Sequence, residues 1–423
     1  MLQADRNQTP GERTIPMTKD KTAVPTGMAL THLDPIFRER PNEYLDVMRS
    51  REPVHQDRMF DRVVLTRAAD VEAVMNNRNL ASDPRRSRPG SFSRLQLRID
   101  ETFRPLILQM DDPDHKRIRD LVVKAFNQAA VDAMRPRITE VARGLLEAID
   151  DPSCFDIMNA YARPLPTIAI ALMLGVDTAR CHDFKQWSDG KMQMFNPHRT
   201  QEQEAILASS DAALAGYFAE VIRKRREERR ADLITSLIDA EEDGKQLNEA
   251  EIIDLCIALL IAGNVTTTDL IGNAVLALLK HPDELGKLLV KPNLVRSTVE
   301  EVLRYDSPVV HGTRIATEAM QIGGCPVAAG QTINAVLYAA NHDPAAHPDP
   351  KRFDIERPDK RHNSFGGGAH FCLGAPLARV ETQIALSMLF ERFPKLRMRT
   401  DRPLKRRIML NFNGLEALWV RAD

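Results

Sequence analysis

One cysteine in a glycine-rich stretch near the C-terminus constrains this 423-residue chain more than any other feature. Cys372 lies in Phe365-Gly-Gly-Gly-Ala-His-Phe-Cys-Leu-Gly374, and Pro376 suits the first turn of a helix that begins just after it. Glycines let backbone N–H groups turn toward the sulfur, and the positive end of the following helix stabilises negative charge there. The stretch therefore predicts an environment suited to a charged sulfur ligand.

The other cysteines limit which metal this sulfur could bind. They lie at positions 154, 181, 256 and 325, without a C-x-x-C pair, so a tetrahedral zinc or iron–sulfur site would lack ligands near Cys372. Haem iron needs only one protein sulfur, which makes haem the simplest interpretation. The alternative is that Cys372 is a small buried apolar residue. This stretch alone leaves both interpretations open.

A second motif combines one carboxylate with two guanidinium groups. Glu301 and Arg304 stand three residues apart in a segment of helical pattern that Pro308 closes. Arg357 follows shortly before the cysteine stretch. We expect these three side chains to lock the loop that precedes Cys372.

In this order and at these distances, the motifs resemble the cytochrome P450 family. The signature loop FxxGxxxCxG of that family is matched by Phe365, Gly368, Cys372 and Gly374, and its ExxR pair by Glu301 and Arg304. The resemblance covers nearly the whole chain. It implies the cytochrome P450 fold, which is mainly α with a small β-sheet region (α+β), and haem b (iron protoporphyrin IX) whose iron is ligated by Cys372.

Composition bounds the domain organisation and the compartment. No interior stretch rich in Gly, Ser or Pro marks a boundary, so we expect one domain over residues 28–423 behind a mobile, polar N-terminal tail, residues 1–27. A net charge of -1 gives no global reason to bind nucleic acid or an anionic membrane. The scattered cysteines favour a reducing compartment, and no apolar run approaches the ~18 residues of a membrane span. We expect a cytoplasmic monomer.

The stretch from Glu251 to Lys280 is apolar nearly all round, which predicts a long buried helix. Its middle holds Gly263 and three threonines, where a weak helix former and hydroxyl groups can bend the helix and make room for a small ligand. This stretch resembles the oxygen-binding groove of the family, with Ala262 and Gly263 matching and Thr266 at the alcohol position.

The groove departs from the family pattern at one residue. The family pattern has an acid just before the threonine. This chain has Val265 at that position, and its side chain can neither accept nor donate a proton. We therefore expect water held by Thr266 to deliver protons, with Asn264 and Thr267 as further candidates. Asp269 is expected to be a buried acid satisfied by neighbouring threonines.

The remaining haem contacts follow from the resemblance. His115 and Arg119 stand four apart on one face of a predicted helix, in a segment similar to the one that binds a haem propionate in the family. Lys116 and Arg117 are read as part of a solvated face. The resemblance also implies propionate contacts from Arg314 and His370, which stand at matching positions elsewhere in the chain. The full set of expected cofactor-binding residues is His115, Arg119, Ala262, Gly263, Arg314, Phe365, Gly366, His370, Cys372 and Gly374.

Candidate substrate contacts come from three segments. The stretch Asp83–Leu108 reads as a long loop, and its apolar residues either line the pocket or pin the loop to the core. The segments after the ExxR helix and near the C-terminus would lie beside the haem. The candidates are Phe92, Leu95, Leu97, Phe103, Val309, Val310, His311, Asn411 and Phe412. His311 and the asparagines make a partly polar substrate plausible.

The resemblance implies a monooxygenase that inserts one oxygen atom of O₂ into a small organic substrate. No flavin fold or ferredoxin cysteine set is fused to the chain, so electrons would come from an acidic ferredoxin and an NAD(P)H-dependent ferredoxin reductase. A basic patch is expected to guide docking; it comprises Lys116, Lys351, Arg352, Lys360, Arg361 and Arg379. Because of Val265, a peroxide-using or rearrangement-type enzyme is an alternative, and a non-catalytic haem-binding sensor is a third.

Overall fold

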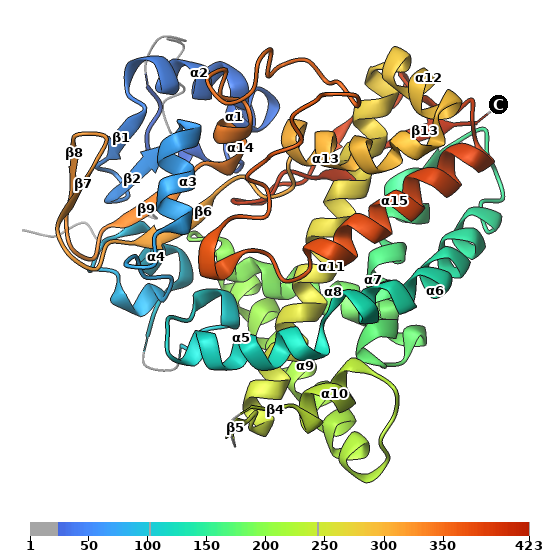
Figure 1. The fold of residues 1–423 in the computed structure, drawn as a ribbon, viewed down its shortest axis with the longest axis horizontal. Helices are drawn as coiled ribbons and strands as arrows, with labels where there is room; N and C mark the ends of the chain where they lie inside the picture. Colours follow the sequence, from blue (N-terminus) through green and yellow to red (C-terminus); the bar gives the residue numbers. More distant parts are fainter. Residues whose placement is uncertain (1–23, 101–102, 243–244, 423) are drawn as a thin grey trace, which may run out of the picture.

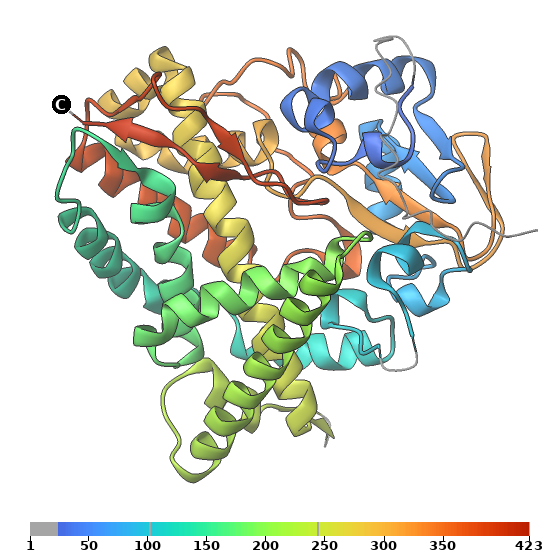
Figure 2. The same ribbon diagram turned by 180° about the vertical axis from the view of Figure 1, so that it is seen from behind.

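The computed structural model describes residues 24–100, 103–242 and 245–422. Helices form most of the molecule and gather around one long central helix, whereas a small sheet and its hairpin lie to one side, as both views show (Figures 1 and 2). The predicted fold class, mainly α with a small β region, is confirmed.

The central helix is α11 (Glu249–Lys280), which Asn248 and Glu251 begin with reciprocal side-chain to backbone hydrogen bonds. The helices that pack against it include α7 (Pro164–Leu174), α8 (Cys181–Lys191), α9 (Gln201–Glu227), α13 (Val295–Tyr305) and α15 (Ala375–Arg392). The predicted long buried helix is confirmed, because side chains on nearly every face of α11 are buried. One large apolar cluster joins these helices to α6 (Gln128–Glu147).

The other helical elements are short. They are η1 (Gly27–Leu30), α1 (Pro35–Glu39), α2 (Pro41–Arg51), α3 (Ala68–Asn76), η2 (Pro84–Arg86), α4 (Phe92–Leu97), η3 (Ile107–Gln109), α5 (Asp114–Ala125), η4 (Met158–Ala162), η5 (Thr178–Arg180), η6 (Met192–Phe195), α10 (Leu233–Asp239), α12 (Pro282–Val290), η7 (Pro292–Leu294), α14 (Leu337–Asn341) and η8 (Gly368–His370).

A four-stranded sheet has the order β1 (Val54–Asp57), β2 (Arg62–Leu65), β9 (Thr332–Ala335), β6 (Gly312–Ile315). Only the β2–β9 pair is parallel, with Val63 opposite Ile333, and every residue of both strands is buried. Two of its strands lie near the N-terminus and two come from beyond residue 311. Such long-range pairing leaves no local signal in the sequence.

The other sheets are small. A three-stranded sheet has the order β10 (Arg397–Met398), β13 (Trp419–Arg421), β3 (Phe155–Asp156). Three further pairs are β4 (Glu241–Glu242) with β5 (Lys245–Gln246), β7 (Met320–Ile322) with β8 (Cys325–Val327), and β11 (Lys405–Arg406) with β12 (Leu415–Ala417).

Two segments differ from their predictions. The stretch read as one long loop, Asp83–Leu108, contains η2, α4 and part of η3. Most of the predicted mobile tail, residues 1–23, lies outside the described residues. Residues 24–27 belong to the packed structure, because Val24 contacts an apolar cluster and the Gly27 N–H donates to Asp57 over 3.0 Å.

Two helices, α9 and α11, are long and apolar enough to cross a membrane by length and composition alone. This differs from the expectation that no such stretch exists. The packing of α11 against helices on several sides accounts for its apolar composition, as is usual for the central helix of a helical domain.

Candidate active site

Cys372 lies in the loop that leads into α15, and its surroundings suit a charged sulfur. The backbone N–H of Cys372 donates to the Phe365 carbonyl over 3.0 Å, which closes the loop. Burial raises the pKa of the Cys372 thiol, while hydrogen bonds from the N–H groups of Gly374 and Ala375 and the charges of Arg119 and Arg379 act in the opposite direction. The loop therefore places helix N–H groups at the sulfur, as predicted.

Glycines are required in this loop because it runs against the end of α3. Gly366 and Gly368 have φ values of 67° and 64°, in the left-handed region. A Cβ atom at Gly368 would lie 2.8 Å from the Met75 carbonyl oxygen, and one at Gly367 would lie 2.9 Å from Asn76 Oδ1. Any side chain at position 368 would displace the loop that carries Cys372.

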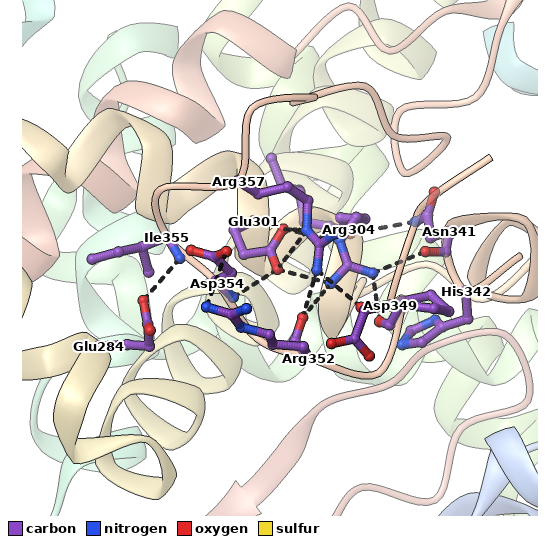
Figure 3. A network of polar contacts seen from close by, with 12 residues as sticks. Glu284, Glu301, Arg304, Asn341, His342, Asp349, Arg352, Asp354, Ile355 and Arg357 are labelled. Carbon is purple, nitrogen blue, oxygen red and sulfur yellow. Dashed lines mark hydrogen bonds and ion pairs between the residues drawn. The ribbon is translucent and has the colours of Figure 1, made fainter. Parts of the chain in front are cut away.

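The predicted lock is assembled around one buried carboxylate, as Figure 3 shows. Arg304 donates to both oxygens of Glu301 over 2.9 and 2.8 Å, and Arg357 Nε lies 3.3 Å from the same carboxylate. Glu301 is 2% and Arg304 1% exposed. Buried charges of this kind are tolerated only when they are paired and fully hydrogen-bonded.

The lock reaches the cysteine loop through backbone carbonyls. Arg304 and Arg357 both donate to carbonyls in the segment 348–352, and Arg304 also donates to the Asn341 carbonyl over 3.0 Å. The Asn341 side chain in turn accepts from the Asn363 N–H over 2.7 Å and donates to Ser364 Oγ over 2.9 Å. The residues just before Phe365 are thus fixed by the same network.

A neighbouring carboxylate, Glu300, supports the loop from the other side. It accepts from Arg379 over 2.7 and 2.9 Å and from His362 over 3.1 Å. Burial works to raise the pKa of Glu300, but the hydrogen bonds from His362 and Arg379 and their charges together lower it to about 2. The Arg379 guanidinium also lies 4.6 Å from the centre of the Phe365 ring. Arg379 therefore braces the loop rather than contributing a free positive charge to a docking patch.

A cluster of hydrogen-bond donors adjoins the cysteine loop. The rings of His115 and His370 lie 4.0 Å apart, and burial, followed by the charges of His115, Arg314 and Arg119, lowers the pKa of His370 to about 3. Buried Arg314 donates to two backbone carbonyls, at 2.9 and 3.3 Å, and burial lowers its pKa to about 10. Arg119 donates to the Phe371 carbonyl over 2.6 Å.

Within the described part of the chain, the only carboxylate within ion-pair distance of these four side chains is Asp112, 3.4 Å from His115 Nδ1. His115 Nε2 is buried without a partner. A buried nitrogen without a partner is costly, so His115, with the positive charges of Arg119 and Arg314 beside it, fits an anionic group such as a haem propionate. The structure thus brings together all four residues predicted to bind the propionates.

The middle of α11 has one open face. Ala262 is exposed and Gly263 and Thr266 are half-buried, although the residues that follow on the other faces are buried. In a helix surrounded by other elements, this exposure means that space lies along the Ala262–Thr266 face. Thr266 Oγ1 donates to the Ala262 carbonyl over 2.7 Å, the bond one turn back that the sequence predicted. The open face fits a small ligand beside haem iron.

Three residues near this face lie differently from the expectation. Asn264 is fully buried and accepts from Thr167 Oγ1 over 3.0 Å, so its amide faces α7 rather than the open side. Thr267 is also buried. Asp269 Oδ2 accepts from Arg407 Nη2 over 2.5 Å, whereas Asp269 Oδ1 lacks a partner, so the expected threonine partners are wrong. Arg407 is 138 residues away in the sequence, which is why the pairing was missed.

The candidate substrate contacts are placed unevenly. Phe92 is fully buried against Phe60, with the Arg62 guanidinium 4.3 Å from its ring centre, so it pins α4 to the core. Val310 belongs to an apolar cluster, and burial lowers the pKa of His311 to about 3. The exposed or half-buried candidates are Leu95, Leu97, Phe103, Val309, Asn411 and Phe412.

Arg199, which sequence reasoning missed, joins α4 to the segment that leads into α9. Arg199 donates to the carbonyls of Gln96 in α4 and of Met194 in η6, over 3.4 and 2.9 Å, and to Glu204 in α9 over 3.0 Å. Arg98 pairs with the same Glu204 carboxylate. Nothing local in the sequence marks Arg199, because its partners lie in separate segments.

Comparison with known proteins agrees with this site. A family model described as Cytochrome P450 matches residues 55–289 and 287–411. The chain belongs to the cytochrome P450 family. Cytochrome P450 107B1 of Saccharopolyspora erythraea is 38% identical over 398 residues, which cover 92% of this chain and 96% of the relative. The 6-deoxyerythronolide B hydroxylase of the same organism is 33% identical over 372 residues, covering 86% and 91%.

Solved structures lead to the same family. The cytochrome P450 PksS of the Bacillus subtilis bacillaene polyketide synthase has a TM-score of 0.84 at 32% identity and covers 93% of this chain and 99% of that one. The predicted family and fold are confirmed. The chain is a cytochrome P450 monooxygenase, and membership of the family implies a haem-iron cofactor with cysteine thiolate ligation.

The lock gives a direct prediction. Replacing Glu301 with alanine leaves two buried guanidinium groups without their carboxylate, so we expect the free energy of unfolding to fall by about 3–5 kcal/mol. Denaturant unfolding measures this loss, and haem content of the purified protein should fall with it. Glu356→Ala is the matched control, because Glu356 is a more exposed acid paired with Lys291, and its loss should leave the free energy of unfolding nearly unchanged. Equal effects in the two variants would contradict the role of the lock.

Proposed function

We propose that this cytochrome P450 binds haem b and that the sulfur of Cys372 would hold the iron. His115, Arg119, Arg314 and His370 would hold the propionates, and Phe365, Gly366, Gly374, Ala262 and Gly263 would line the ring. The observation that carries this assignment is the cluster of donors beside the cysteine loop, in which His115 and Arg314 are buried and the only acid partner among the described residues is Asp112. Glu301, Arg304 and Arg357 would hold the loop in place.

Haem iron with a thiolate ligand supplies the cleavage of O₂. The protein must then deliver protons and exclude competing water. Thr266 lies on the open face of α11 with its hydroxyl donating to the Ala262 carbonyl, which leaves its oxygen free to accept a hydrogen bond from water. Val265 is buried and apolar. We therefore assign proton delivery to water ordered by Thr266, because Asn264 faces away from this side.

We propose a small, mainly apolar organic substrate with at least one polar group. The cytochrome P450 relatives include a Vitamin D(3) 25-hydroxylase of Pseudonocardia autotrophica, and a related enzyme of Bacillus megaterium was crystallised with testosterone. In this chain, Val309 and Phe412 form a backbone bridge, and buried Asn411 Oδ1 lacks a partner. An apolar face beside a single amide suits such a substrate.

Electrons would come from an acidic ferredoxin and an NAD(P)H-dependent reductase in the cytoplasm, with the enzyme acting as a monomer. Five of the six predicted patch residues are paired with acids: Lys116 with Asp120, Lys351 with Asp46, Arg352 with Asp354, Arg361 with Asp359, and Arg379 with Glu300. The patch is therefore less positive than its sequence suggests. Phe371, 43% exposed beside Cys372, offers a short path for electrons.

Product formation should require O₂, NAD(P)H, ferredoxin and reductase together.

Arg361 is an exposed arginine, with 85% of its side chain accessible. We expect Arg361→Glu to raise the KM for ferredoxin by a few-fold, roughly the effect of one surface charge, without changing kcat. Arg223→Glu is the control, because Arg223 is an exposed arginine paired with Glu227 on α9. If the two variants behave alike, docking near Arg361 is wrong. Product formed with peroxide alone, and none with NAD(P)H, would favour the peroxide-using alternative.

The missing acid gives a second prediction. Val265→Asp should raise NAD(P)H-driven turnover and the fraction of electrons recovered in product, because it adds a proton donor next to Thr266. Val265→Asn is the matched control, since its amide has a similar size but supplies no acidic proton. Both variants need haem content equal to that of the parent protein. Unchanged or lower coupling in Val265→Asp would show that the chain does not lack an acid there.

A further inference from the structure

One buried carboxylate on α11 is not used in the proposed chemistry. Asp269 is fully buried, and its Oδ2 accepts from Arg407 Nη2 over 2.5 Å. Arg407 directly follows β11 and is itself largely buried. A buried ion pair contributes little net stability, but removing one partner is costly, so such pairs are suited to fixing one geometry.

The other arm of the same hairpin also lies against Asp269. A Cβ atom at Gly414 would lie 1.8 Å from Asp269 Oδ1, so no side chain fits there. The Arg407 N–H donates to the Gly414 carbonyl over 2.9 Å, which joins the two arms. One turn further along α11, Asn273 donates to the Asn413 carbonyl over 2.9 Å. The hairpin between β11 and β12 is thus fixed to α11 at two successive turns.

The tip of this hairpin carries Asn411 and Phe412. The Val310 N–H donates to the Asn411 carbonyl over 3.0 Å, and Phe412 forms a backbone bridge with Val309. The Phe412 ring lies 5.9 Å from the ring of Phe195 in η6, edge to face. The tip therefore meets the segment after α13 on one side and the segment leading into α9 on the other.

We propose that Asp269 is a positioning residue that determines substrate selectivity by holding the hairpin tip, residues 407–414, at a fixed distance from the open face of α11. Asp269 lies three residues after Thr266, so one helix places both the Thr266 hydroxyl and the tip. The residue thereby sets how large a ligand fits between Phe412 and the haem. This inference rests on the proposed haem site and on Phe412 bordering the substrate pocket.

The charged groups that face Asp269 are Arg407, Lys185 and Arg163. Asp269→Asn keeps the size of the side chain but removes the charge that holds Arg407. Gly414→Ala is an independent change, because it forces a methyl group into the space of the carboxylate. Both changes should let the tip shift without altering the cysteine loop.

The test uses the haem-loaded full chain and two haem-binding probes, imidazole and 4-phenylimidazole, titrated by their absorbance shift. We expect Asp269→Asn and Gly414→Ala to weaken 4-phenylimidazole binding about tenfold, which is about 1.4 kcal/mol, with imidazole affinity changing less than about twofold. Asp269→Asn combined with Arg407→Gln should restore 4-phenylimidazole binding, because two neutral amides can pair. Asp132→Asn, at an exposed acid on α6 paired with Arg135, is the control and should change neither affinity.

Each outcome decides the proposal. Equal changes in affinity for both probes would indicate a general effect on the haem site. No change in affinity for either probe would indicate that the pairing of Asp269 with Arg407 does not set the size of the pocket. Either result would overturn the proposal. If Asp269→Asn does not fold, Gly414→Ala and the double variant give the same comparison. If the absorbance of the parent protein does not shift with imidazole, the proposed haem site is wrong. That result differs from one in which the haem site is present but the Asp269–Arg407 pair does not affect selectivity.

Discussion

Two buried guanidinium groups share one buried carboxylate, and the loop that carries Cys372 depends on them. Arg304 and Arg357 bind Glu301 and use their remaining N–H groups on backbone carbonyls. Each polar atom left unpaired in such a place would cost free energy. The segment before the cysteine loop can therefore adopt few other conformations. A ligand sulfur needs this rigidity, since it must be presented to the metal at one distance and angle.

The haem site contains several imperfect groups that a bound cofactor would complete. His115 Nε2 is buried without a partner, Arg314 is buried against carbonyls, and Ala262 is exposed in the middle of a buried helix. The unpartnered nitrogen of His115 is unfavourable in a protein that binds nothing, and the exposure of Ala262 marks space beside α11. The haem site we propose accounts for both, since a propionate would pair with the donors and the ring would occupy the space.

The sequence predicted the parts of the site that depend on short spacings. Cys372 and its glycines act within one loop, and Glu301 and Arg304 stand one helical turn apart, so their patterns are visible in the chain. Pairings between distant segments were predicted only where the family resemblance implied them, as for Arg357 with Glu301. Arg379 was assigned to a docking patch but binds Glu300, 79 residues away, and Asp269 was assigned threonine partners but binds Arg407. Phe92 was a substrate candidate, yet an apolar residue in an irregular stretch has the same composition whether it faces the core or the pocket.

The central claim is that the sulfur of Cys372 binds haem iron, and the absorption spectrum of the reduced, carbon-monoxide-treated protein tests it most directly. The account predicts the band characteristic of thiolate-ligated haem in the parent protein and its loss in Cys372→Ala. A colourless parent protein, or a chromophore that is unchanged in Cys372→Ala, would contradict it.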